Sequence, residues 1–184
     1  MRILRAAAHF GAEKGLERVQ MHEVAKEAGV AIGTLYRYFP SKIHLFTAVM
    51  AEQIEHLDGS APSTAPGTDP EDAVADLLVF ASRQLLCKPT LASAMLQSAN
   101  AANAAMVTDA GRIDTRFHSL LLRTLGLDEP TAHDVTLVRL LVQCWYGVLQ
   151  SSLNGRVSMP DAENDIRVAC RLLLVPRSNA DRSG

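Results

Sequence analysis

Apolar residues recur every three or four positions along most of the 184-residue chain, and runs that alternate apolar and polar residues are nearly absent. The first spacing marks one face of an α-helix, whereas the second marks a half-buried strand. The pattern therefore predicts an all-α protein. We expect helices in the following ranges: 1–14, 21–28, 32–39, 41–57, 70–87, 90–105, 109–125, 131–153 and 160–175.

One stretch without large apolar residues divides the chain. The segment GSAPSTAPGTDP at 59–70 holds three prolines, two glycines and four Ser or Thr residues. Such a segment cannot contribute to a core and is typical of a linker. We therefore expect an N-terminal domain at 1–57, a linker at 58–70, a second helical domain at 71–175 and a frayed tail at 176–184.

Several expected helix boundaries carry their own signals. Thr68, Thr131 and Ser158 are each followed three residues later by an acidic residue, which is the spacing of a capping box. Gly15 is expected to end the first helix in a left-handed conformation, and Gly29 to form a tight turn between the second and third helices.

The first 57 residues have the layout of a helix-turn-helix unit. Two short helices, 21–28 and 32–39, are joined by a turn that contains Gly29 and follow a longer helix. Apolar residues at helical spacing are expected to form its small core: Ile3, Leu4, Ala7, Phe10, Val19, Val24, Ala25, Val30, Leu35, Phe39, Leu45 and Val49.

The third helix carries the candidate chemistry. Leu35 and Phe39 lie one turn apart and are expected to face the core. The other side chains then point outward: Gly33, Thr34, Tyr36, Arg37 and Tyr38. Tyrosine and arginine can bind phosphate, and arginine can pair with guanine, so this face favours DNA binding. Spacing alone leaves the alternative that Tyr36 and Tyr38 are half-buried packing residues.

Charge supports only a local nucleic-acid contact. The chain carries 18 Lys and Arg against 20 Asp and Glu, a net charge of −2. Residues 1–57 hold seven basic and six acidic residues, so any contact with DNA is expected in this first third. Ser41 is expected to cap the fourth helix and to place Lys42 beside free amides that attract phosphate.

The segment 21–49 resembles the DNA-binding domain of TetR-family transcriptional regulators, with the run GTLYRYFPSK at 33–42 as its most specific part. This resemblance covers 1–57. It implies an all-α homodimer whose third helices enter successive major grooves of a palindromic, double-stranded DNA operator. Matched position by position, it implies DNA contacts at eight residues: Gln20, His22, Gly33, Thr34, Tyr36, Arg37, Tyr38 and Lys42.

Two features depart from the family pattern. Ala31 stands where the family usually has a Ser or Thr cap for the recognition helix, and the loss of that acceptor costs about 1 kcal/mol. The sequence also starts directly on the first helix, without the basic arm that many relatives carry. We therefore expect modest non-specific affinity for DNA.

The last two predicted helices are candidates for subunit contact. Helix 131–153 is apolar nearly all round, and helix 160–175 carries a second apolar stripe. A helix of the first kind needs partners on more than one side. We therefore expect these helices from two subunits to form a four-helix bundle, which agrees with the homodimer that the family implies. A single monomeric core is the alternative.

A hydrophobic effector pocket is expected between these helices and the DNA-binding unit. The segment 91–106 mixes small, apolar and amide side chains, which would underfill a core but could line a cavity with a few polar anchors. Loose helix packing is the alternative, and the family resemblance favours the pocket. The candidate ligand-binding residues are Phe80, Met95, Leu96, Asn100, Asn103, Phe117, Leu121, Trp145 and Leu149.

Within the family, the run VAIGTLYRYFPSKIHL and a tryptophan inside a long apolar helix are similar to actinobacterial cholesterol-catabolism repressors of the KstR type. That resemblance implies a large amphipathic effector, such as a steroid-derived coenzyme A thioester. A ligand-binding helical module that never contacts DNA is the alternative function.

The sequence offers little support for catalysis. Its six histidines lack metal-ligand spacing, and no phosphate-binding loop or nucleophile motif is visible, so we expect no enzyme, no metal site and no cofactor.

Cys87, Cys144 and Cys170 lie far apart in apolar stretches, and we expect buried reduced thiols in a cytoplasmic protein. No signal peptide opens the chain, and polar residues interrupt the best membrane-span candidate, 135–153, so we expect no membrane association.

Overall fold

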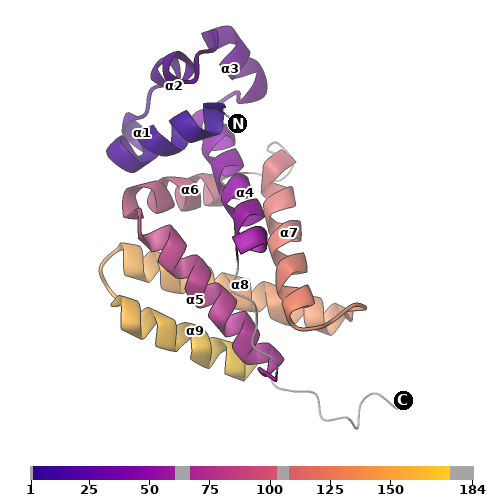
Figure 1. Cartoon of the computed structure of the whole chain (residues 1–184). Coiled ribbons are helices and arrows are strands. Elements are labelled where there is room, and N and C mark those ends of the chain that lie inside the picture. Colours follow the sequence, from indigo (N-terminus) through magenta and orange to yellow (C-terminus); the bar gives the residue numbers. More distant parts are fainter. Residues whose placement is uncertain (1, 61–66, 103–107, 175–184) are drawn as a thin grey trace. The chain divides into compact units, whose positions relative to one another are not determined.

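The structure, a computed structural model, describes residues 2–60, 67–102 and 108–174, with the backbone alone described for Asp58, Ser60 and 108–113. Within these residues the regular structure is entirely helical, as predicted (Figure 1). The helices are α1 Arg2–Arg18, α2 Met21–Ala28, α3 Ile32–Tyr38, α4 Lys42–Ser60, α5 Pro70–Leu86, α6 Pro89–Ala101, α7 Thr108–Thr124, α8 Ala132–Leu153 and α9 Met159–Leu173.

The largest differences from the predicted boundaries lie at helix ends. Gly15 has the expected positive φ of 73°, but it produces a kink rather than an end, since α1 continues to Arg18. Helix α4 runs through Gly59 to Ser60 and so enters the predicted linker. The rest of that linker up to residue 66, and the predicted tail at 176–184, lie outside the described residues.

The chain folds into two compact units, which are described separately. The first, unit 1, comprises Met1–Ser60 and Gln84–Phe117, and the second, unit 2, comprises Ala61–Arg83 and His118–Gly184. Both α5 and α7 contribute residues to each unit. The packing units therefore differ from the proposed division at 58–70, because α6 packs with the N-terminal helices.

In unit 1, α6 lies against both α1 and α4 (Figure 1). The three helices meet at Gly11, which is buried in α1. A Cβ at this position would come within 3.0 Å of side-chain atoms of both Phe46 on α4 and Leu91 on α6. Only a residue without a side chain therefore permits this approach.

Most of the predicted N-terminal core is buried in unit 1, with two exceptions. Phe10 and Val30 are only half-buried. Phe10 lies in the middle of α1, where the ammonium of Lys14 is 4.8 Å from the centre of its ring, and Val30 lies in the turn after α2. The buried members are Ile3, Leu4, Ala7, Val19, Val24, Ala25, Leu35, Phe39, Leu45 and Val49.

In unit 2, a buried polar chain joins α8 to α5. The indole N–H of Trp145 donates to Ser82 Oγ at 2.8 Å, and Ser82 Oγ donates to the carbonyl oxygen of Leu78 at 2.7 Å. Ser82 is fully buried and Trp145 is 4% exposed. The one polar group of the tryptophan is thus satisfied inside the core, as buried indoles require.

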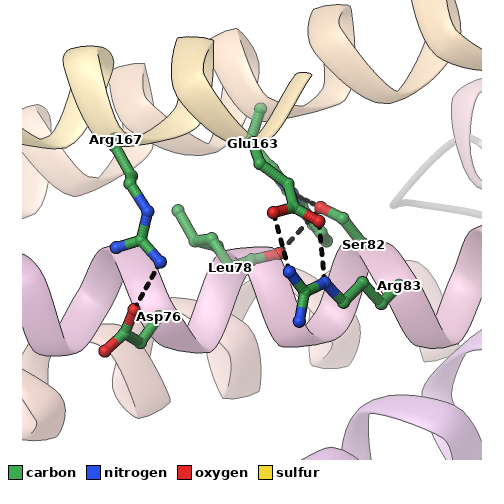
Figure 2. Close-up of polar contacts among 7 residues, drawn as sticks. Asp76, Leu78, Ser82, Arg83, Glu163 and Arg167 are labelled. Atoms are coloured by element: carbon green, nitrogen blue, oxygen red, sulfur yellow. Dashed lines mark hydrogen bonds and ion pairs between the residues drawn. The ribbon is translucent and has the colours of Figure 1, made fainter. Parts of the chain in front are cut away.

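Ion pairs at the surface join α5 to α9 in the same unit (Figure 2). Arg83 donates from Nε and Nη2 to the two carboxylate oxygens of Glu163, both at 2.7 Å. Nη2 of Arg167 lies 2.7 Å from Oδ1 of Asp76. The hydrogen bonds from Arg83 hold the pKa of Glu163 below its usual value. Exposed pairs contribute little free energy, so they orient α9 on α5 more than they stabilise it.

The predicted helix starts in unit 2 are confirmed at two positions. Thr131 and Asp134 form a complete capping box at the start of α8, and Ser158 Oγ accepts from the backbone N–H of Asp161 at the start of α9. Although α8 is the longest and one of the most apolar helices, no helix within the described residues is long and apolar enough to cross a membrane.

The three cysteines are free thiols, but the prediction that all are buried is wrong. Only Cys170 is buried, and desolvation raises the pKa of its thiol to about 12. Cys87 and Cys144 are exposed. Cys87 follows the end of α5, and Cys144 lies one helical turn from Leu140 on α8, which is also exposed. Helix α8 is apolar nearly all round, yet this chain covers only part of its circumference.

We predict that Gly11→Ala lowers the free energy of unfolding by about 1–3 kcal/mol, because the added methyl must displace the Phe46 ring or the Leu91 side chain. Gly59→Ala is the matched control, since a Cβ there meets no atom within 4 Å. Urea unfolding of both variants measures the difference. Equal stabilities for the two variants would contradict the close packing at Gly11.

Candidate nucleic-acid interface

The turn between α2 and α3 is built on a left-handed glycine. Gly29 adopts the left-handed conformation, with φ 66° and ψ 39°. Its N–H donates to the carbonyl oxygen of Lys26, and the N–H of Val30 donates to that of Ala25. This pair of bonds is the Schellman motif, which closes the end of α2 and redirects the chain into α3.

Helix α3 is held by one buried side chain and exposes most of the others. Leu35 is fully buried, and Phe39, just after the helix, is 8% exposed. Tyr36 and Tyr38 are 48% and 56% exposed, so both belong to the solvent-exposed side of α3 and not to its buried core. As expected, Ala31 provides no side-chain cap for the helix.

The remaining predicted DNA-contact residues also lie at the surface of unit 1. The guanidinium of Arg37 lies 5.3 Å from the centre of the Tyr38 ring, a cation–π contact that orients both side chains. Gln20 precedes α2 and makes no side-chain cap bond. Gln20, His22, Gly33 and Arg37 are exposed, whereas Thr34 and Lys42 are partly buried.

Lys42 has a second role that sequence reasoning missed. Its Nζ donates to the backbone carbonyl oxygen of Glu17 at 2.9 Å, so it ties the start of α4 to the end of α1. A lysine ammonium has three N–H donors, which leaves two for a phosphate. Ser41 caps α4 as predicted, because its Oγ accepts from the backbone N–H of His44 at 3.4 Å.

An ion pair between α1 and α2 was also missed. Lys14 Nζ donates to Glu23 Oε1 at 2.7 Å across nine residues of sequence, and both side chains are about two-thirds buried. This hydrogen bond holds the pKa of Glu23 below its usual value. The pair has no sequence signal, because its residues lie on different helices and share no periodic pattern.

The exposed apolar residues gather on two surfaces. Among the described residues, every large hydrophobic side chain that is exposed belongs to α3 or to the pair α8 and α9. On α3 these are Ile32, Tyr36 and Tyr38, and on α8 and α9 they are Val135, Leu140, Val168 and Leu172. Ile32 was not predicted as a contact residue. Its absence from the predicted core positions of this helix, Leu35 and Phe39, is the sequence signal that could have indicated its exposure.

Two family models match the chain and together cover most of it. Residues 3–49 match the bacterial regulatory proteins of the tetR family, and residues 67–173 match the tetracyclin repressor-like C-terminal domain. The chain belongs to the TetR family. It is therefore a TetR-type transcriptional repressor with a helix-turn-helix, and its homologues are transcriptional regulators rather than enzymes.

Individual proteins show which members of the TetR family this chain is similar to. It is 33% identical to the transcriptional repressor KstR of Rhodococcus jostii over 94% of its own length and 81% of that protein, so the KstR resemblance is confirmed. The crystal structure of a TetR transcriptional regulator from Rhodococcus sp. RHA1 is 57% identical, covers 96% of each chain and has a TM-score of 0.91.

A more distant structure shares the fold alone. It is FadR of Thermus thermophilus, a TetR-family transcriptional repressor in complex with lauroyl-CoA. The identity is 21%, the match covers 97% of each chain and the TM-score is 0.70.

The predicted effector-binding residues of this regulator do not gather in one packing unit. Unit 1 holds Met95, Leu96 and Phe117, which are buried, and Asn100, which is exposed. Unit 2 holds Leu121, Trp145 and Leu149, which are buried, and Phe80, which is half-buried. Asn103 lies outside the described residues.

An open polar hollow in unit 1 involves none of these residues. Its volume is about 200 Å³, and it lies between the kinked end of α1 and the first turns of α6. Residues 14–18 of α1 line one side, and Thr90, Ser93, Ala94 and Gln97 line the other.

Trp145 has a structural role within unit 2. We predict that Ser82→Ala lowers the free energy of unfolding by about 1–3 kcal/mol, because it removes the buried hydroxyl that accepts from the indole N–H. Ser93→Ala is the matched control, since Ser93 is only half-buried on α6 and its hydroxyl accepts an exposed hydrogen bond from Gln97. If urea unfolding gives the two variants the same stability, the buried bond does not hold α8 to α5.

Proposed function

We propose that the chain acts as a homodimer on a palindromic operator and is released from it by a hydrophobic small molecule. The observation that carries the proposal is the exposure of Tyr36, Arg37 and Tyr38 on a short helix that is anchored by Leu35. Aromatic surface of this extent on a solvent-facing helix is costly unless it makes contacts. Together with the family membership, it supports α3 as the helix that enters the major groove.

The polar groups around α3 suit two different tasks on DNA. The hydroxyls of Tyr36 and Tyr38, and the free donors of Lys42, are suited to bind phosphates and so to position the helix. Arg37 has the planar fork that pairs with guanine O6 and N7 or with a phosphate. Gln20 and His22 lie at the start of α2, where the first helix of the motif crosses the backbone.

The second apolar surface supports the proposed homodimer. Val135 and Leu140 on α8, and Val168 and Leu172 on α9, are 38% to 72% exposed in the single chain. A second copy that pairs α8 and α9 as a four-helix bundle would remove these side chains from water. The pairing would have to place the two α3 helices about 34–36 Å apart, which is one turn of DNA.

Release by an effector requires a path from α6 to the DNA-binding helices. Helix α6 contacts both α1 and α4 within unit 1, and Gly11 brings the three into close contact. A ligand that displaces α6 would therefore move α1 and α4 by side-chain packing. A tenfold loss of operator affinity requires that the ligand favour the displaced form by about 1.4 kcal/mol.

For the effector we propose a coenzyme A thioester with a large apolar acyl group, of the steroid-derived kind. The support is the similarity to KstR along most of the chain and the fact that a repressor of the same fold, FadR of Thermus thermophilus, holds lauroyl-CoA. The alternative, a ligand-binding module that never contacts DNA, does not account for the aromatic surface of α3.

We predict that Arg37→Ala weakens binding to duplexes enriched by the wild-type chain from a randomised library by about 1–3 kcal/mol, through loss of a base or phosphate contact. Wild-type affinity should also fall as salt is added. Arg156→Ala, an exposed arginine between α8 and α9, is the control. Unchanged binding by Arg37→Ala, together with affinity that is insensitive to salt, would remove the proposed surface.

We predict that Leu172→Glu converts the dimer into a monomer, because the proposed interface would have to bury an unpaired carboxylate. Gln97→Glu adds the same charge on the exposed side of α6 and should leave the dimer intact. Sedimentation equilibrium of both variants measures the subunit number. A dimeric Leu172→Glu variant would place the subunit contact elsewhere.

A further inference from the structure

Ile32 is an exposed residue that the hydrogen-bonding roles of α3 leave unexplained. Its side chain is 42% exposed in the first turn of the helix. It lies one turn before Tyr36, which is exposed, and three residues before Leu35, which is buried. Ile32 therefore stands at the border between the buried and the exposed face, beside the surface proposed to meet DNA.

The chemistry of an isoleucine restricts what it can recognise. It has no hydrogen-bond donor or acceptor, so it can bind neither a phosphate nor a polar base edge. In the major groove, the apolar group that base edges present is the C5-methyl group of thymine. Isoleucine is also stiff at χ1 in a helix, so little conformational entropy is lost when it makes a contact.

The residue beside Ile32 permits a close approach. Gly33 is exposed, and a Cβ built on it meets no atom of the chain within 4 Å. The first turn of α3 therefore presents one branched apolar side chain next to a position that has none. A surface of this shape can reach the floor of a groove without a clash at the neighbouring residue.

We propose that Ile32 contacts the C5-methyl group of one thymine in each half-site and is thereby a specificity-determining residue of α3. The inference rests on the proposed function, since it requires α3 to lie in the major groove. It goes beyond that function because it assigns a base preference to one side chain. The contact distinguishes thymine from cytosine, and also from uracil, which differs from thymine only by the missing methyl group.

The test uses the full chain and duplexes that the wild type enriches from a randomised library. Each thymine is replaced in turn by uracil, which keeps base pairing and removes only the methyl group. For the wild type we expect one thymine in each half-site at which the replacement weakens binding about three- to fivefold. Ile32→Ala should bind the two duplexes equally, whereas Ile32→Val, which keeps a branched apolar side chain, should retain the preference for thymine.

Two results would overturn the inference and leave DNA binding intact. One is a wild-type chain that tolerates uracil at every position, and this result does not depend on the stability of any variant. The other is an Ile32→Ala chain that keeps the full preference for thymine. Failure of the wild type to enrich any duplex would instead overturn the proposed function, and the inference with it.

Discussion

The close approach of α1, α4 and α6 at Gly11 is the constraint on which the rest of unit 1 depends. Because Gly11 has no side chain, Phe46 and Leu91 can pack directly on the backbone of α1. Helix α1 in turn positions α2 through the Lys14–Glu23 ion pair and the start of α4 through the bond between Lys42 and a backbone carbonyl. The placement of α3 therefore depends on the contact that α1 and α4 make with α6, a helix that lies far from α3 in the sequence.

The features that the sequence predicts well are those set within a few residues of each other. The turn at Gly29 and the cap at Thr131 follow from residue types at fixed local spacing, and both are present. The outward position of Tyr36 and Tyr38 follows from the buried positions of their neighbours on one short helix. The family resemblance, carried by ten consecutive residues, is confirmed by a family model that matches residues 3–49, and a second model extends the family match to residues 67–173.

The features that the sequence could not supply join residues that are distant along the chain. Trp145 and Ser82 are 63 residues apart, and Arg83 and Glu163 are 80 apart, so no periodicity connects them. The exposure of Cys144 was missed for a related reason. An apolar helix predicts that partners exist, but it does not say whether they come from the same chain or from a second copy.

Two exposed apolar surfaces, one on α3 and one on α8 and α9, account for every exposed large hydrophobic side chain in the described part of the chain. The central claim is that the first of these surfaces is the one that meets DNA. Amide hydrogen exchange of the full chain, with and without an enriched duplex, tests it most directly. The account predicts slower exchange across residues 31–42 when the duplex is bound, and unchanged exchange there in a saturated complex would contradict it.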